Sequence, residues 1–113
     1  MEVAFDKIGE VVATFEAADG VAVGKAVKIT ANGQVGPCSA AGDVPAGVVV
    51  SLRDGLAGVQ LRGYVELPCA ATLTTGYETV SIDASGKVQA SDSGRPALVV
   101  YADTAAGLCG LFL

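Results

Sequence analysis

Hydrophobic and polar residues alternate one by one over residues 58–67. A period of two is typical of a half-buried strand, because successive side chains of a strand point to opposite sides of its sheet. Pro68 ends the pattern, since proline has no N–H to donate to a neighbouring strand. One predicted face carries Val59, Leu61, Gly63, Val65 and Leu67, and the other carries Gln60, Arg62, Tyr64 and Glu66.

An apolar run rich in β-branched residues, 47–52, precedes this stretch. Asp54 and Gly55 separate the two, and an Asp-Gly pair between apolar runs is a strong signal for a tight turn. We therefore predict a long central hairpin from Gly47 to Leu67, around which the rest of the chain is organised.

Glycines and turn-forming pairs divide the remaining chain into short segments. Asn32-Gly33 predicts a hairpin with a type I′ turn, in which both central residues have positive φ. No stretch of ten or more residues shows the 3.6-residue apolar period of a helix. The predicted fold class is therefore all-β, a small barrel or sandwich of about eight to ten short strands. The predicted strands are 9–15, 26–30, 34–36, 47–52, 58–67, 78–82, 87–89, 97–102 and 108–113.

The two halves of the chain resemble each other at an offset of roughly fifty residues, long enough for a supersecondary unit. Each half reads as a hairpin, a loop and a second hairpin. Any glycine-punctuated β chain resembles itself to some degree, but here three matches occur in the same order. The matched segments are 24–35 with 76–88, 46–52 with 96–102, and 54–59 with 103–108.

The first eight residues show no alternation bounded by turns. We expect residues 1–8 to form a flexible N-terminal arm and residues 9–113 to form a single β domain. Val3, Phe5 and Ile8 lie among charged residues of this arm. They are candidate partner-binding residues, because an extended arm can add to an exposed strand edge while an aromatic ring fills a pocket. The alternative is a simple frayed terminus.

Charge and hydropathy exclude two classes of partner. The chain of 113 residues has a net charge of -5, and its seven basic residues are scattered, whereas nucleic-acid binding requires clustered cations. No apolar run reaches the ~20 residues of a membrane span, and the N-terminus lacks the pattern of a signal peptide. We expect neither nucleic acid nor membrane as a partner, and a cytoplasmic location before any assembly.

The three cysteines, Cys38, Cys69 and Cys109, match no metal-binding spacing. The favoured interpretation is three reduced and mostly buried small hydrophobic residues. The alternative is one disulfide with a free thiol, which would require an oxidising compartment.

Catalytic patterns are absent from the sequence. The chain has no histidine, so no Ser-His or Cys-His nucleophile pair can form. No dinucleotide or phosphate-binding glycine motif occurs, and nearly all the aspartates lie next to glycine or in predicted turns, where their side chains bond the backbone. We therefore predict a protein that is not an enzyme and has no metal or cofactor. The polar face of Gln60, Arg62, Tyr64 and Glu66 is the candidate recognition surface, with a solvated strand face as the alternative.

The run Gly63-Tyr64-Val65-Glu66-Leu67-Pro68, the segment 19–24, the unit from Gly76 to Val88 and the leucine-ended C-terminal strand together resemble a known family. They are similar to the small capsid decoration (cement) proteins of tailed phages and prophages. The resemblance implies a structural protein of the virion that binds the major capsid protein on the outside of the head, often as a homotrimer. A small-ligand or carbohydrate-binding β-barrel is the alternative function.

Overall fold

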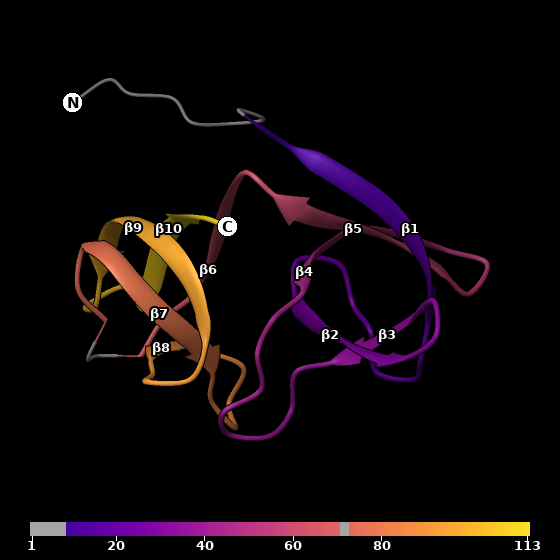
Figure 1. Cartoon of the computed structure of the whole chain (residues 1–113), viewed down its shortest axis with the longest axis horizontal. Helices are drawn as coiled ribbons and strands as arrows, with labels where there is room; N and C mark the ends of the chain where they lie inside the picture. Colours follow the sequence, from indigo (N-terminus) through magenta and orange to yellow (C-terminus); the bar gives the residue numbers. More distant parts are fainter. Residues whose placement is uncertain (1–8, 71–72) are drawn as a thin grey trace.

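Ten strands form two sheets in the computed structural model, which describes residues 9–70 and 73–113 (Figure 1). The all-β fold class predicted from the sequence is confirmed. The strands are β1 (Val11–Ala17), β2 (Ala26–Ala31), β3 (Gln34–Pro37), β4 (Gly47–Arg53), β5 (Leu56–Arg62), β6 (Tyr64–Pro68), β7 (Gly76–Ile82), β8 (Val88–Ala90), β9 (Arg95–Asp103) and β10 (Leu108–Phe112).

The two sheets repeat one strand order. Strands β1 to β5 close into a barrel in the order β1-β5-β4-β2-β3, and strands β6 to β10 form a sheet in the order β6-β10-β9-β7-β8. A short parallel pairing of β1 with β3, at Glu16↔Gln34 and Ala17↔Val35, closes the first sheet. An isolated parallel bridge, Cys69↔Val88, stands at the equivalent place in the second. The chain thus contains two similar halves, here called the barrel lobe (residues 11–62) and the second lobe (residues 64–112).

The predicted central strand is in fact two strands. Gly63 has φ 105°, a conformation that residues with a side chain rarely adopt, and it divides β5 of the barrel lobe from β6 of the second lobe (Figure 1). The hairpin therefore consists of β4 and β5, and β6 pairs with β10 instead. Its turn has Asp54 at φ 53° and Gly55 at φ 76°, as a type I′ turn requires. The prediction that one strand continues to Leu67 was wrong, because a period of two does not reveal where the backbone bends.

Each lobe has a hydrophobic core, and the core of the second lobe extends across the boundary into the barrel lobe. The barrel core is Val21, Val27, Val35, Val49, Ala57 and Val59. The second core also includes Ala26, Cys38 and Val48 of the barrel lobe. Both cores are built mainly from β-branched and small side chains, which pack well on a pleated sheet.

Polar contacts also connect the lobes. The Arg95 guanidinium at the start of β9 donates to the carbonyl oxygens of Pro45 at 3.2 Å, Ala46 at 2.6 Å and Leu61 at 2.7 Å. The Asp43 carbonyl accepts the backbone N–H of Ile82 at 2.8 Å. These bonds fix how the two lobes lie against each other.

Candidate functional site

The structure divides the predicted polar face between the lobes. Gln60 is only 6% exposed, and its side-chain amide donates to the carbonyl oxygens of Arg62 at 3.1 Å and Tyr64 at 3.0 Å. It supports the bend at Gly63 from inside, so the prediction that Gln60 lies on an exposed face was wrong. Arg62 is exposed at the end of β5 in the barrel lobe. Only Tyr64 and Glu66, both on β6, lie together.

Tyr64 and Glu66 form a cluster with a residue that the sequence did not single out, Tyr101 of β9. The Tyr64 hydroxyl donates to Glu66 Oε2 at 3.0 Å, and the Tyr101 hydroxyl donates to the same oxygen at 2.7 Å. The Tyr64 ring also meets Phe112 edge to face, with ring centroids 5.5 Å apart. We call Tyr64, Glu66 and Tyr101 the tyrosine–glutamate cluster.

Gly110 of β10 provides the space that this cluster occupies. Gly110 pairs with Glu66 on one side and Tyr101 on the other, so the three residues form one row across the sheet. A Cβ at this position would collide with the Tyr64 hydroxyl and the Tyr101 ring. Because Gly110 has no side chain, both tyrosine rings can lie over β10, the strand between β6 and β9.

Both phenols of the cluster remain protonated hydrogen-bond donors. Burial, followed by bonding with Tyr101 and Glu66, raises the pKa of Tyr64 well above its usual range. The bond to the Glu66 carboxylate, followed by burial, raises the pKa of Tyr101. The Glu66 carboxylate is therefore held by two donors and kept in one orientation.

The cluster is part of a wider aromatic surface. Strand pairing places Tyr64, Phe112, Leu98 and Tyr77 in a second row, across β6, β10, β9 and β7. Tyr77 is 85% exposed and lines a depression of about 270 Å³ together with Leu98 and Phe112. All three tyrosines of the chain thus lie on one side of the second sheet. We call Tyr64, Tyr77, Leu98, Tyr101 and Phe112 the aromatic face.

Sequence reasoning missed Tyr77, Tyr101 and Phe112. One available signal was position, because every tyrosine follows Gly63 and falls in the second half of the chain. The register that brings them together was not visible. In particular, β9 has an irregularity that pairs Val99 with Leu111 but Tyr101 with Gly110. Val100 is the extra residue of this bulge. In a regular strand, Tyr101 would lie on the same side of the sheet as the buried Val99. The bulge places Tyr101 on the other side, opposite Gly110.

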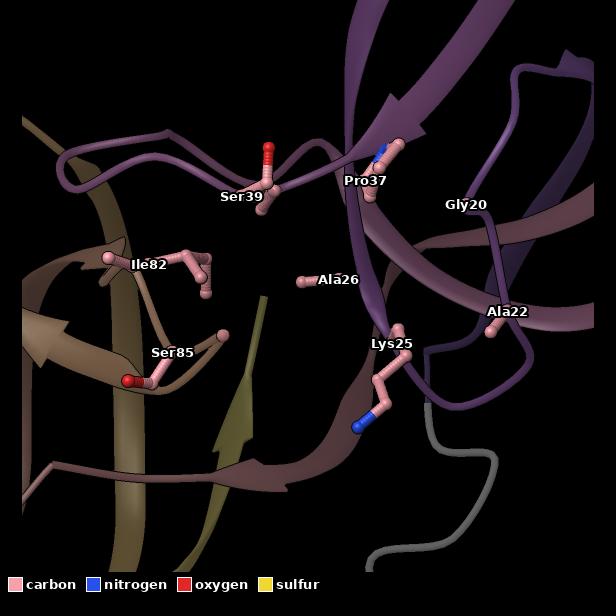
Figure 2. A pocket seen from close by; sticks show the side chains of 11 residues that line it. Gly20, Ala22, Lys25, Ala26, Pro37, Ser39, Ile82 and Ser85 are labelled. Carbon is pink, nitrogen blue, oxygen red and sulfur yellow. The ribbon is translucent and has the colours of Figure 1, made fainter.

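A cleft of about 310 Å³ lies between the lobes (Figure 2). Figure 2 shows Ala26 and Ile82 facing each other across its centre, whereas the Ser39 hydroxyl points away from them. Ile82 is fully buried and Ala26 nearly so, which means that packing between the lobes closes the floor. Lys25 and Ser85 are polar lining residues. None of the residues that line the cleft is aromatic, in contrast to the aromatic face.

The three cysteines are buried and unpaired, as the favoured interpretation of the sequence held. Burial raises the pKa of Cys38 to about 11 and that of Cys109 to about 12. The Cys109 thiol donates to the Leu67 carbonyl oxygen at 3.4 Å. Both thiols stay protonated at neutral pH, as expected of cysteines that serve as core residues.

Several sequence predictions concern positions that the structure leaves out. Val3, Phe5 and Ile8 of the predicted arm lie outside the described residues. Within residues 9–70 and 73–113, no group of three His, Cys, Asp or Glu side chains is arranged to hold a metal ion. The same part of the chain has no helix long and apolar enough to cross a membrane.

Comparison with known proteins adds no family assignment, since no protein-family model and no curated protein matches the chain. The aromatic face, together with the Glu66 carboxylate that bonds to two of its tyrosines, is therefore identified as the candidate functional site on its geometry alone.

Proposed function

We propose that this protein is a structural protein that binds the outside of a phage or prophage head as a decoration protein. Its partner in this proposal is the major capsid protein, and its location is the capsid surface after a cytoplasmic phase. The observation that carries the proposal is the aromatic face, where the exposed Tyr77 ring and three half-buried rings gather on one side of one sheet. This face includes Tyr64 of the run that resembles decoration proteins, and the Tyr64 hydroxyl donates to Glu66 of the same run.

The residue types of the aromatic face support a protein-binding role. Tyrosine is enriched at interface hot spots, because it buries a large area while ordering few torsions. Tyr77 buries almost nothing in the isolated chain, so its contribution to folding is small and its ring is available to a partner. An exposed apolar patch of this kind typically marks an interaction site.

The proposal is tested by co-sedimentation with purified phage heads that lack their decoration protein. We expect binding at micromolar concentration, and we expect Tyr77→Ala to weaken it at least fivefold, or about 1 kcal/mol. Val23→Ala is the matched control, since Val23 is 58% exposed but lies on the barrel lobe. Failure of the unaltered protein to sediment with such heads would overturn the proposal, as would equal losses in the two variants.

The second candidate function is a carbohydrate-binding module. It is favoured by one observation, the depression of about 270 Å³ beside the exposed Tyr77 ring, on which a sugar ring could stack. A polysaccharide array separates the two functions. Retention by glycans that is lost in Tyr77→Ala, without binding to heads, would favour the module.

A further inference from the structure

We propose that the tyrosine–glutamate cluster is a binding site for a cationic side chain, an arginine presented by a partner protein. The Glu66 carboxylate is exposed, and both of its phenol donors bind one oxygen, Oε2. A guanidinium that approaches the carboxylate meets Glu66 Oε1 beside two tyrosine rings. This site is assigned from side-chain geometry and does not depend on whether the partner is a capsid.

The charge distribution of the second lobe favours a cation. Residues 64–113 contain five acidic residues and two basic ones, Lys87 and Arg95. Arg95 is already occupied by carbonyl oxygens of the barrel lobe. Among the described residues two ion pairs occur, Lys28–Asp43 and Arg53–Asp54, and Glu66 belongs to neither. The Glu66 carboxylate, which bonds to two tyrosines of the aromatic face, thus lacks a cationic partner within the described chain.

The chemistry of the cluster matches arginine better than other cations. A guanidinium is planar and weakly hydrated, so it can stack on an aromatic ring and donate to a carboxylate at the same time. The two phenols hold the carboxylate in place before the ligand arrives, which lowers the entropic cost of binding. Gly110 leaves the space beneath the cluster that the Tyr64 hydroxyl and the Tyr101 ring occupy.

The direct test is an NMR titration with two matched peptides, acetyl-Gly-Arg-Gly-amide and the same peptide with citrulline in place of arginine. Citrulline keeps the shape of arginine but carries no charge. We expect saturable shifts at Glu66, Tyr64 and Tyr101 with the arginine peptide, and binding at least tenfold weaker with the citrulline peptide. Equal affinities for the two peptides, or no saturable shift with either, would overturn the proposal.

Two variants distinguish a specific site from general attraction to an acidic lobe. Glu66→Gln removes the charge but retains an oxygen that can accept from both phenols, and we expect it to weaken binding at least fivefold. Asp103→Asn is the matched control, because it removes the same charge from the end of β9, outside the cluster. We expect a loss below twofold there, and equal losses in the two variants would overturn the assignment.

A third variant keeps the proposal testable if Glu66→Gln does not fold. Tyr101→Phe keeps the ring and the carboxylate but removes one of the two donors that orient it. We expect this variant to weaken arginine binding about twofold to fivefold, a loss that is smaller than that from removing the charge. Unchanged binding in a folded Tyr101→Phe protein would show that the cluster is not the site. Peptide binding without head binding would leave this site standing while refuting the capsid proposal.

Discussion

At the residue scale, Gly33 shows how one backbone angle fixes a hairpin. It lies in the two-residue turn between β2 and β3 with φ 68°, and a Cβ placed there would touch nothing within 4 Å. Gly33→Val would therefore act through backbone strain alone. We expect a loss of about 1 kcal/mol or more in the free energy of unfolding, because a β-branched residue is strained at positive φ.

Urea unfolding of Gly33→Val beside Gly33→Asn measures this strain. Asparagine tolerates the left-handed conformation better than valine, so the Asn variant should lose less. Equal stability of the Val variant and the unaltered protein would contradict the prediction. Asn32 itself does not have positive φ, so the type I′ turn predicted here was wrong, and the type I′ angles occur at Asp54-Gly55 instead.

Asp43 gives the protein a pH-dependent contribution to stability. Its Oδ2 accepts backbone N–H groups from Ser39 at 2.9 Å and Ala40 at 3.0 Å, and the Lys28 ammonium at 2.9 Å. The Ala40 N–H and then the Lys28 side chain, with the Ser39 N–H, lower the pKa of this carboxyl in the folded protein. A carboxyl with a lowered pKa stabilises the fold above its unfolded pKa of about 3.9, and this contribution is lost as the pH falls through the folded pKa.

We therefore expect Asp43→Asn to be less stable than the unaltered protein at about pH 7, with the difference shrinking as the pH falls below about 4. Urea unfolding across this range measures the effect. Asp92→Asn, at an exposed loop position, is the matched charge control. A difference that stays constant from neutral to acidic pH would contradict the assignment.

At the scale of elements, alternation and turn pairs were sufficient to find β2, β3, β4 and β5. Apolar β-branched runs bounded by Asn-Gly or Asp-Gly leave few other structures. The candidate site was only half predictable. Tyr64 and Glu66 follow from their alternating positions on one strand, but Tyr101 lies on the same face because of a bulge that no sequence pattern predicted. Gln60 was misplaced because its burial depends on the bend at Gly63.

Arg95 connects elements of the two lobes, and replacing it should show how much this connection contributes to the free energy of unfolding. Arg95→Met keeps the aliphatic stem but leaves three carbonyl oxygens without their donor. We expect a loss of about 3 kcal/mol in the free energy of unfolding, since bonds to a charged group are each worth ~1.5–3 kcal/mol and water replaces part of them. Arg53→Met is the control, because that side chain is 92% exposed. Equal midpoints of urea unfolding for the two variants would refute this role.

At the scale of the whole molecule, the repeat was visible in the sequence but the difference between the halves was not. Similar hairpins at an offset of roughly fifty residues predict similar strand orders. Whether such a sheet closes depends on a few backbone bonds. Two residue pairs join β1 to β3, whereas one bridge joins Cys69 to Val88. One or two backbone pairs leave no pattern in hydropathy, so the closure of the sheet could be established only from the three-dimensional structure.

The last prediction concerns assembly. Ten large hydrophobic side chains of the described residues are exposed, and several lie on the barrel lobe away from the aromatic face, among them Ile29, Leu52 and Leu56. Leu52 and Leu56 both lie at the end of one hairpin, where Leu52 pairs with Ala57 and Leu56 with Arg53. A chain of 11.2 kDa with this much apolar surface lowers its free energy when further copies cover that surface.

We expect a homotrimer, with a mass by light scattering close to three times that of the chain. Leu56→Ser should shift the mass toward the monomer, while Leu108→Ser, an equally exposed position on the second lobe, should not. A monomer mass for the unaltered protein at high micromolar concentration would contradict self-association through the barrel lobe.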